Sequence, residues 1–262
     1  MVSCSSDLTV KLWELNEYQC AKTFYGHNHS VSWAAFVLDD ECIISCSRDK
    51  SIKLWEVATG FCKRTFAGHE EWVRQVVATS DSKTLASCSS DHIILLWAID
   101  KETPTLQLTG HENVVECIVF VEGERAQTLA SSEFLKSKFK TSIKNLKQVE
   151  NGTQALAPQR LFLVSGSRDK SVRLWNCTNG DQLHTFIGHD TWVRSLALHP
   201  TGKWLYSASD DKSVRVWDLN FGKEKRRLEA HEHFVSTVRH NPRYAVLASS
   251  GQDMTIKIWT LK

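Results

Sequence analysis

The sequence predicts an all-β chain that is built from about six copies of one short structural unit. The tryptophans that mark the copies lie 42, 42, 78, 42 and 42 residues apart, and a serine and an aspartate keep the same spacing. Between these markers, short runs that fit strands are separated by Ser-Asp and glycine-containing turns, as in antiparallel sheets. With 262 residues, of which 42% are hydrophobic and 24% charged, the chain can bury a sizeable core.

Four residue types recur in register along the chain. The tryptophans are Trp13, Trp55, Trp97, Trp175, Trp217 and Trp259. The aspartates six residues before them are Asp7, Asp49, Asp91, Asp169, Asp211 and Asp253. The serines are Ser3, Ser45, Ser87, Ser165, Ser207 and Ser249, and the histidines are His27, His69, His111, His189 and His231.

A period near 42 residues, with Gly-His early and Trp late, resembles the WD40 repeat, which implies a β-propeller with one four-stranded blade per repeat. The repeats divide the chain into units at about 1–25, 26–67, 68–109, 110–187, 188–229 and 230–262. The first unit lacks a Gly-His and a first strand, and the last stops after a third strand. We therefore expect a propeller that is incomplete at the N-terminus, with exposed sheet edges.

The unit at 68–109 illustrates the strands that we expect. Val73–Ala78, Thr84–Ser89 and Ile93–Ala98 fit the first three strands, and a fourth should follow near Leu106. A small sheet of this kind cannot bury both of its faces alone, so neighbouring units must stack.

Serine, histidine and aspartate in each unit are also the inventory of a hydrolytic triad. The resemblance to WD40 repeats implies instead that these three and the tryptophan form a hydrogen-bonded chain inside each blade, which we call the tetrad. The set recurs in five of the six units, an active site has no need of five copies, and no GxSxG elbow accompanies it. We therefore predict a structural role, no enzyme activity and no cofactor.

The chain offers few candidates for a metal site. The pairs His27/His29 and His231/His233 could bind a metal, but no third ligand type is spaced near them. We predict that each pair is a buried tetrad histidine beside an exposed one, and that no metal is bound. The eight cysteines form no CxxC pair, and Cys4, Cys46 and Cys88 lie between serines at one position of the repeat, which is typical of reduced, buried thiols.

The long interval places an insertion at about 121–160, between the first and second strands of one blade. Lys136, Lys138, Lys140, Lys144 and Lys147 make this segment basic. Apolar residues at helical spacing favour a basic amphipathic helix that could bind calmodulin, an anionic membrane or an acidic partner; these are Leu135, Phe139, Ile143, Leu146 and Val149. A mobile surface loop is the interpretation that we prefer.

The overall charge does not identify a partner. A formal net charge of +2 provides no field that favours nucleic acid or a membrane surface, so we predict neither as a partner. No apolar run reaches the length of a membrane helix, and the start lacks the regions of a signal peptide. We expect a cytoplasmic protein.

Partner-binding residues are expected where the turn before the third strand and the loop that carries Gly-His converge. Cations flank the turn aspartates on some blades only, and Trp-Val-Arg follows two of the histidines. Alternation along a strand would place each Trp and Arg of these segments on one face, and both types are frequent interface hot spots. The alternative is that these cations only pair with neighbours such as Glu70, Glu71 and Asp190. The predicted binding set is Arg48, Trp72, Arg74, Arg168, Trp192, Arg194 and Lys212.

Six segments are similar, in the same order, to pieces of the lissencephaly-1 family: SRDKSIKLWEVATGFC, GHEEWVRQV, VVECI, SGSRDKSVRLW, GHDTWVRSL and AHEHFVST. The resemblance implies a seven-bladed ring preceded by a dimerising helical region, with this chain a homodimer only if that region is present. It also implies a face that binds the cytoplasmic dynein motor domain and regulates its microtubule-based activity in nuclear migration, spindle and centrosome positioning and cell division. The implied location is the cytoplasm, on the cytoskeleton, microtubules and centrosome.

The same resemblance implies two further partners, the catalytic subunits of a platelet-activating-factor acetylhydrolase and nuclear-distribution coiled-coil proteins. A regulatory, non-catalytic subunit of that acetylhydrolase is therefore an alternative function. A generic WD40 adaptor, such as a ubiquitin-ligase substrate receptor, is a third, although the paired Trp-Val-Arg segments disfavour it.

Overall fold

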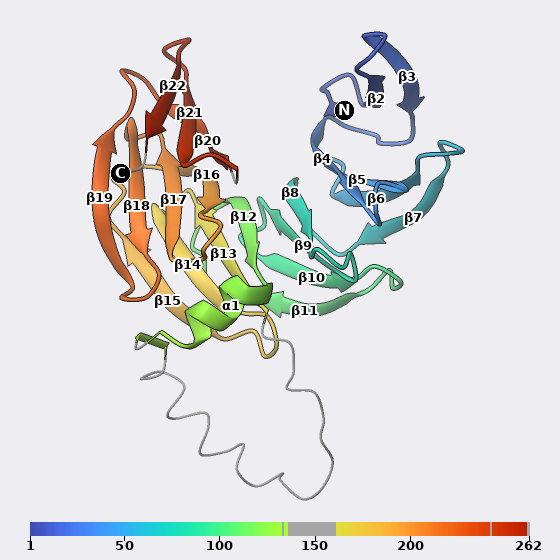
Figure 1. Ribbon diagram of the computed structural model, residues 1–262. Helices are drawn as coiled ribbons and strands as arrows, with labels where there is room; N and C mark the ends of the chain where they lie inside the picture. Colours follow the sequence, from blue (N-terminus) through green and yellow to red (C-terminus); the bar gives the residue numbers. More distant parts are fainter. Residues whose placement is uncertain (133, 136–160, 242, 261–262) are drawn as a thin grey trace, which may run out of the picture. The chain divides into compact units, whose positions relative to one another are not determined.

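The computed structural model of the protein describes residues 1–132, 134–135, 161–241 and 243–260. These residues form two compact units, Met1–Ile118 and Val119–Lys262, each made of stacked antiparallel sheets (Figure 1). In this part of the chain, no helix has the length and apolar character needed to cross a membrane.

Strands account for nearly all of the regular structure. The first unit contains β1 (Val2–Cys4), β2 (Val10–Glu14), β3 (Gln19–Phe24), β4 (Val31–Val37), β5 (Cys42–Ser47), β6 (Ser51–Glu56), β7 (Cys62–Ala67), β8 (Val73–Ala78), β9 (Thr84–Ser89), β10 (Ile94–Ala98) and β11 (Pro104–Leu108). Next come β12 (Val115–Val121), which begins before the boundary, α1 (Gly123–Ala130), β13 (Phe162–Ser167), β14 (Ser171–Asn176), β15 (Gln182–Ile187), β16 (Val193–Leu198), β17 (Trp204–Ser209), β18 (Ser213–Asp218), β19 (Lys223–Glu229), β20 (Val235–Asn241), β21 (Val246–Gly251) and β22 (Ile256–Thr260).

The described strands make six antiparallel sheets, and each sheet is one blade of the repeat. Four sheets have four strands in chain order, β4 to β7, β8 to β11, β12 to β15 and β16 to β19. The sheets β1-β2-β3 and β20-β21-β22 have three strands each. Ile256 and Ile258 on β22 are 74% and 64% exposed. The prediction of an all-β propeller-type chain of about six blades is confirmed.

Neighbouring sheets of one unit stack through their first two strands. In the first unit β1 contacts β4 and β4 contacts β8, and in the second β13 contacts β16 and β16 contacts β20. The tryptophan of one sheet also meets the last strand of the sheet before it, since the rings of Phe24 and Trp55 lie 5.9 Å apart and those of Phe66 and Trp97 lie 5.8 Å apart. Trp55 and Trp97 are at most 1% exposed, so these contacts form the core between neighbouring sheets.

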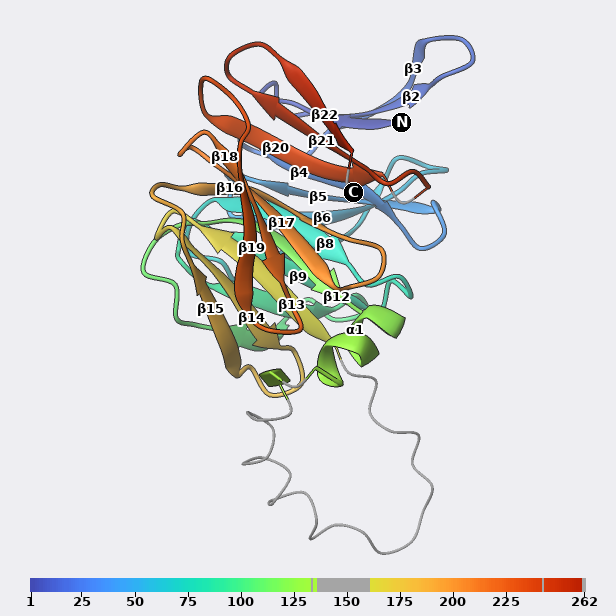
Figure 2. The same cartoon turned by 60° about the vertical axis from the view of Figure 1, so that its left-hand side comes forward.

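The start of the predicted insertion is ordered. It forms α1, which lies at one end of the strands of its unit (Figures 1 and 2). Leu129 and Leu135 are fully buried, and Arg125 donates a hydrogen bond from Nε to the carbonyl oxygen of Pro200 at 3.0 Å. The prediction of a loop throughout 121–160 was therefore wrong for its first residues, because their apolar side chains are buried in the fold. The proposed basic helix lies largely outside the described residues.

Two glycines let this segment approach the neighbouring turns closely. Gly202, in the turn between β16 and β17, has φ +70, and a Cβ there would lie 2.8 Å from the Cα of Arg125. Gly222, in the turn between β18 and β19, would similarly collide with Phe134, whose ring lies 4.6 Å from that of His184. The insertion thus joins its own sheet to the next one.

We expect Gly202→Ala to lower the free energy of unfolding by about 2 kcal/mol, because a left-handed alanine costs roughly 1 to 2 kcal/mol and its methyl also displaces α1. Gly123→Ala is the matched control. Gly123 has φ +59, but nothing lies within 4 Å of the position that an alanine methyl would take, so only the backbone cost of about 1 kcal/mol applies. Urea unfolding of both variants measures the difference, and equal losses would contradict the docking of α1.

Candidate functional site

The tetrad side chains meet inside the sheets. In the sheet β4 to β7, His27 Nδ1 lies 2.8 Å from a carboxylate oxygen of Asp49, and His27 Nε2 lies 2.8 Å from Ser45 Oγ. Trp55 donates its indole N–H to the same hydroxyl oxygen at 2.8 Å. Each polar atom therefore has a partner, which makes a buried network favourable. The corresponding bonds are present in three further repeats: His69, Asp91, Ser87 and Trp97; His189, Asp211, Ser207 and Trp217; His231, Asp253, Ser249 and Trp259.

The remaining two repeats contain recognisable parts of the same arrangement. Trp13 donates to Ser3 Oγ at 2.7 Å, in a repeat whose sequence has no histidine. Trp175 donates to Ser165 Oγ at 2.8 Å, and His111 is buried.

Each tetrad aspartate also builds the turn before the third strand. Asp49 Oδ1 accepts hydrogen bonds from both the backbone N–H and the hydroxyl of Ser51, at 2.9 and 2.6 Å. Lys50 between them has φ +70, in the left-handed region. Such a turn is sharp because the carboxylate replaces backbone partners. The same left-handed position is held by Leu8, His92, Lys170, Lys212 and Met254.

The tetrad carboxylates are held ionised. Burial alone would raise the pKa of Asp49, but hydrogen bonds from His27, from Ser51 and from the backbone of Asn28 together outweigh it, and the pKa lies well below its usual range. The pKa values of Asp91, Asp211 and Asp253 are lowered in the same way. A carboxylate that accepts several bonds keeps its charge at neutral pH, so the histidine N–H has a fixed acceptor.

Because they are buried, the tetrad serines cannot contact a substrate. Ser45, Ser87, Ser165 and Ser207 are 0% exposed, and each hydroxyl already accepts an indole N–H. A nucleophile must reach an acyl carbon, whereas these oxygens lie within the packed core. The arrangement can stabilise the sheets but cannot attack an ester.

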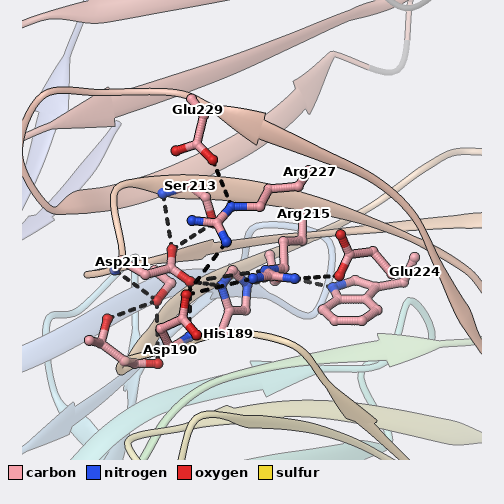
Figure 3. A network of polar contacts seen from close by, with 12 residues as sticks. His189, Asp190, Asp211, Ser213, Arg215, Glu224, Arg227 and Glu229 are labelled. Carbon is pink, nitrogen blue, oxygen red and sulfur yellow. Dashed lines mark hydrogen bonds and ion pairs between the residues drawn. The ribbon is translucent and has the colours of Figure 1, made fainter.

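One tetrad extends into a larger ionic network (Figure 3). Arg215 on β18 is 6% exposed and pairs with Glu224 on β19, and its Nε lies 4.0 Å from Asp211. Arg227 on β19 contacts both Asp190 at 3.5 Å and Glu229 at 2.8 Å. The network connects the turn aspartate with the outer strand of the same sheet.

Six of the seven predicted binding residues form two stacks of an indole with two guanidinium groups. In the first stack, Arg48 and Arg74 lie 4.5 and 5.3 Å from the ring centre of Trp72. In the second, the guanidinium carbons of Arg168 and Arg194 lie 4.1 and 4.8 Å from the ring centre of Trp192. At these distances cations and the indole face attract one another.

Each stack joins two successive sheets of one unit. Arg48 precedes the tetrad aspartate of the sheet β4 to β7, whereas Trp72 precedes β8 of the next sheet. Trp72 and Trp192 are 36% and 38% exposed, so each indole offers an edge to a partner while its arginines hold it in place. Lys212 is exposed, and in the part of the chain that the structure describes it belongs to neither stack.

A bulge, and not regular strand alternation, aims the second arginine of each stack. Val73 pairs with Ser89 and Gln75 with Cys88, which leaves Arg74 as an extra residue in β8. Arg194 is the extra residue of β16 in the same way, and both tryptophans lie just before their strands. The prediction that alternation places Trp and Arg together was wrong in its reason, because a bulge reorients the side chain locally.

Two residues that contact the stacks were missed by the sequence reasoning. Arg194 makes a two-point ion pair with Asp210, both bonds being 2.8 Å long, and Arg74 Nε donates to Ser90 Oγ at 2.9 Å. Asp210 and Ser90 each precede a tetrad aspartate, so their shared place in the repeat was the available signal. This position of the repeat is therefore charged at the second stack, where it is Asp210, and neutral at the first, where it is Ser90.

A second set of missed residues connects neighbouring sheets. A donor in the last strand of one sheet reaches a carbonyl oxygen in the turn of the next. Lys22 Nζ bonds the carbonyl of Val57 at 2.8 Å, and Arg64 Nη1 bonds that of Ile99 at 2.9 Å. His184 Nε2 lies 2.9 Å from the carbonyl oxygen of Gly222. These repeated bonds satisfy carbonyl groups in the connecting turns.

The two histidines of the candidate metal pair His27/His29 lie in different environments. His27 is buried in its tetrad, whereas His29 is exposed, and its Nδ1 accepts the backbone N–H of Ser30. Within the described ranges, no group of three or more His, Cys, Asp or Glu side chains could hold a metal ion. All eight cysteines are free, and burial raises the pKa of the Cys46 and Cys88 thiols well above their ordinary value.

The blades and their tetrads define a WD40-repeat protein. The chain belongs to this family, since the model of the WD domain, G-beta repeat, matches residues 18–56, 60–98, 151–176, 180–218 and 222–260, more than half of the chain. Members of this family serve as binding scaffolds.

Similar curated proteins match over short stretches. The chain is 54% identical over 39 residues to a nuclear distribution protein PAC1 of Coprinopsis cinerea, which is 15% of this chain and 9% of that protein. It is 50% identical over 38 residues to a lissencephaly-1 homolog of Heterostelium pallidum, which is 14% and 9% of the two chains. A PAC1 protein of Cryptococcus neoformans is 43% identical over 47 residues, which is 18% of this chain and 11% of that one. Each match thus spans about a tenth of the relative's length.

Proposed function

We propose that this chain is a non-enzymatic WD40 scaffold that binds the cytoplasmic dynein motor domain and regulates its microtubule-based activity. The observation that carries the proposal is the pair of Arg-Trp-Arg stacks, Arg48/Trp72/Arg74 and Arg168/Trp192/Arg194. Rigid, half-exposed tryptophans held between arginines have the features of interface hot spots. Lys212 would add a further cation near the turn surface.

The names of the similar proteins support this choice of partner. They are a lissencephaly-1 homolog and nuclear distribution proteins, and the six segments that resemble the lissencephaly-1 family include both Trp-Val-Arg motifs. The proposed place of action is the cytoplasm, on microtubules and at the centrosome. Nuclear-distribution coiled-coil proteins are further proposed partners.

We expect saturable binding when purified dynein motor domain is titrated onto the immobilised chain. Arginines at an exposed rim act partly through long-range charge, so affinity should fall severalfold when the salt is raised from about 0.05 to 0.15 M, as the Debye length shortens to roughly 8 Å. Lys225→Ala, which removes a cation near the ring of Trp204 away from the stacks, should leave binding unchanged.

Absence of saturable binding would contradict the choice of partner. The same assay with catalytic subunits of platelet-activating-factor acetylhydrolase tests the alternative assembly. Ester hydrolysis by the purified chain alone, lost on changing Ser45, Ser87 or Ser165, would contradict the scaffold role.

A further inference from the structure

A pocket in the unit Val119–Lys262 is lined by residues of the sheet β16 to β19 and of the sheet β20 to β22. Its volume of about 430 Å³ is in the range of ligand-binding pockets. None of its lining residues belongs to an Arg-Trp-Arg stack. They are His199, Trp204, Tyr206, Val216, Lys225, Arg226, Leu228, Ala245, Trp259 and Thr260.

Much of the lining is aromatic or aliphatic. Trp204 on β17 and Trp259 on β22 contribute one indole from each sheet. Val216, Leu228 and Ala245 add aliphatic surface. Such surfaces pack well against a flat ring, so the pocket favours a ligand with an aromatic group.

Tyr206 supplies a hydroxyl group that the fold leaves unused. The residue is 1% exposed, and its ring stacks on that of His240 at 5.9 Å and lies 6.5 Å from that of His199. Burial raises the pKa of this phenol to about 12, so the hydroxyl is protonated at neutral pH and can donate. Within the described ranges it has no hydrogen-bond partner. Buried tyrosine hydroxyls usually have one, so a ligand can supply the acceptor.

His199 offers a second donor. Its Nδ1 accepts the backbone N–H of Thr201 at 3.2 Å, so in the neutral imidazole the proton is on Nε2. Burial and the positive charge of Arg125 lower the pKa of His199, which favours this neutral form. Tyr206 and His199 can therefore both donate to an acceptor on a ligand.

Two lysines place positive charge beside these residues. The Nζ atoms of Lys203 and Lys225 lie 5.0 and 5.9 Å from the ring centre of Trp204. Both side chains are exposed, and in the part of the chain that the structure describes neither forms an ion pair. Lys225 is on β19, the outermost strand of its sheet, and the described lining contains no carboxylate. Charge complementarity therefore favours an anionic ligand.

We propose that this pocket binds a tyrosine side chain within an acidic segment of a partner protein. The ring of that tyrosine packs against Trp204 and Trp259, its hydroxyl oxygen accepts from Tyr206 or His199, and carboxylates next to it in the segment pair with Lys203 and Lys225. A peptide carries several carboxylates around one ring, whereas a small aromatic acid has one, so two separate lysines favour the peptide. The site goes beyond the proposed function and does not depend on it.

The test begins with four peptides that are titrated into the full chain by calorimetry. They are acetyl-Glu-Asp-Tyr-Asp-Glu-amide, the same peptide with phenylalanine or alanine in place of tyrosine, and acetyl-Lys-Lys-Tyr-Lys-Lys-amide. We expect saturable binding of the acidic tyrosine peptide, about fivefold weaker binding with phenylalanine because one hydrogen bond is lost, and at least about tenfold weaker binding with alanine. The basic peptide should not bind.

Tyr206→Phe tests the buried hydroxyl. It removes one oxygen that has no partner within the described ranges, so the melting temperature should stay close to that of the parent. We expect this variant to bind the tyrosine and phenylalanine peptides within about twofold of each other, because the donor that distinguishes them is gone. A fivefold preference for tyrosine that persists in Tyr206→Phe would overturn the proposed contact.

The double variant Lys203→Ala with Lys225→Ala tests the charge. We expect it to weaken binding of the acidic tyrosine peptide by about tenfold, as two ion pairs are lost. Lys223→Ala is the matched control, because it removes an exposed cation from the same strand but outside the lining, and it should change affinity by less than about twofold. An equal loss in the control and the double variant would overturn the site, since it would show general attraction between charges.

Two further outcomes would overturn the proposal. One is no saturable binding of the acidic tyrosine peptide by the parent chain. The other is binding of free 4-hydroxyphenylacetate as tight as that of the peptide, which would assign the pocket to a small aromatic acid. Motor-domain binding that persists in Tyr206→Phe and in the double lysine variant would show that this site and the stacks act separately. Loss of motor binding in these variants would contradict that separation.

Discussion

Replacing Asp211 by alanine is expected to lower the free energy of unfolding by about 3 to 5 kcal/mol, the cost of breaking a buried charged network. The carboxylate accepts bonds from His189 Nδ1 at 2.7 Å and from the Ser213 hydroxyl at 2.6 Å, and it also accepts the backbone N–H of Asp190. Its loss leaves the buried imidazole of His189 without its acceptor and removes a carboxylate 4.0 Å from the buried guanidinium of Arg215, which keeps its pair with Glu224 (Figure 3). Urea unfolding at neutral pH measures the loss.

Asp190→Ala is the matched control for this variant. Its side chain is 69% exposed, and it contacts Arg227 at 3.5 Å in the same network, so its removal should cost at most about 1 kcal/mol. A loss for Asp211→Ala no greater than that of Asp190→Ala would contradict the stabilising role of the tetrad.

The same variant should change how stability depends on pH. Burial acts to raise the pKa of Asp211, but the bonds from His189 and Ser213 outweigh it and lower the pKa below the unfolded value. The ionised carboxylate therefore stabilises the fold above about pH 4 and loses this contribution as the pH falls toward the folded-state pKa. We expect the stability gap between the parent and Asp211→Ala to narrow below about pH 4.

The double variant Arg168→Ala with Trp192→Ala is expected to weaken binding of the dynein motor domain by more than about 2 kcal/mol, roughly thirtyfold. It removes an exposed indole and the guanidinium that lies 4.1 Å above it, without touching a tetrad. Truncation of a central anchor loses both its contact area and its directed bonds.

Stability and affinity must be read together for this variant. Because Trp192 is 38% exposed, we expect the melting temperature of the double variant to stay close to that of the parent. The double variant Arg48→Ala with Trp72→Ala reports the contribution of the first stack in the same titration. Motor affinity unchanged by both double variants would contradict the role of the stacks.

Much of the fold could be predicted because the repeat is defined by short and constant separations along the chain. Trp55 lies ten residues after Ser45 and six after Asp49, and two strands joined by a tight turn bring residues at these separations together. The strand positions at Val73–Ala78 and Thr84–Ser89 agree with the structure for the same reason, and the third strand begins at Ile94, one residue later than predicted.

From the sequence, the candidate binding residues could be predicted only as arginine, lysine and tryptophan side chains gathered at one end of the blades. Their contacts depend on neighbours in other repeats, as Arg48 lies over Trp72 of the next sheet and Arg74 is aimed by a bulge. Neither is visible in a period of 42, because the bulge preserves the chain spacing while it changes the direction of a side chain. The docking of α1 on Gly202 likewise involves residues 77 apart with no repeating pattern.

The sequence by itself determined the all-β repeat, the tetrads and the turns that they hold, since these depend on hydrogen bonds between residues fixed by short separations along the chain. Only the tertiary structure decided which arginines share an indole, that Arg194 pairs with Asp210, and where the insertion packs. Those features arise from stacking of one sheet on the next, and stacking brings together side chains that no local pattern relates.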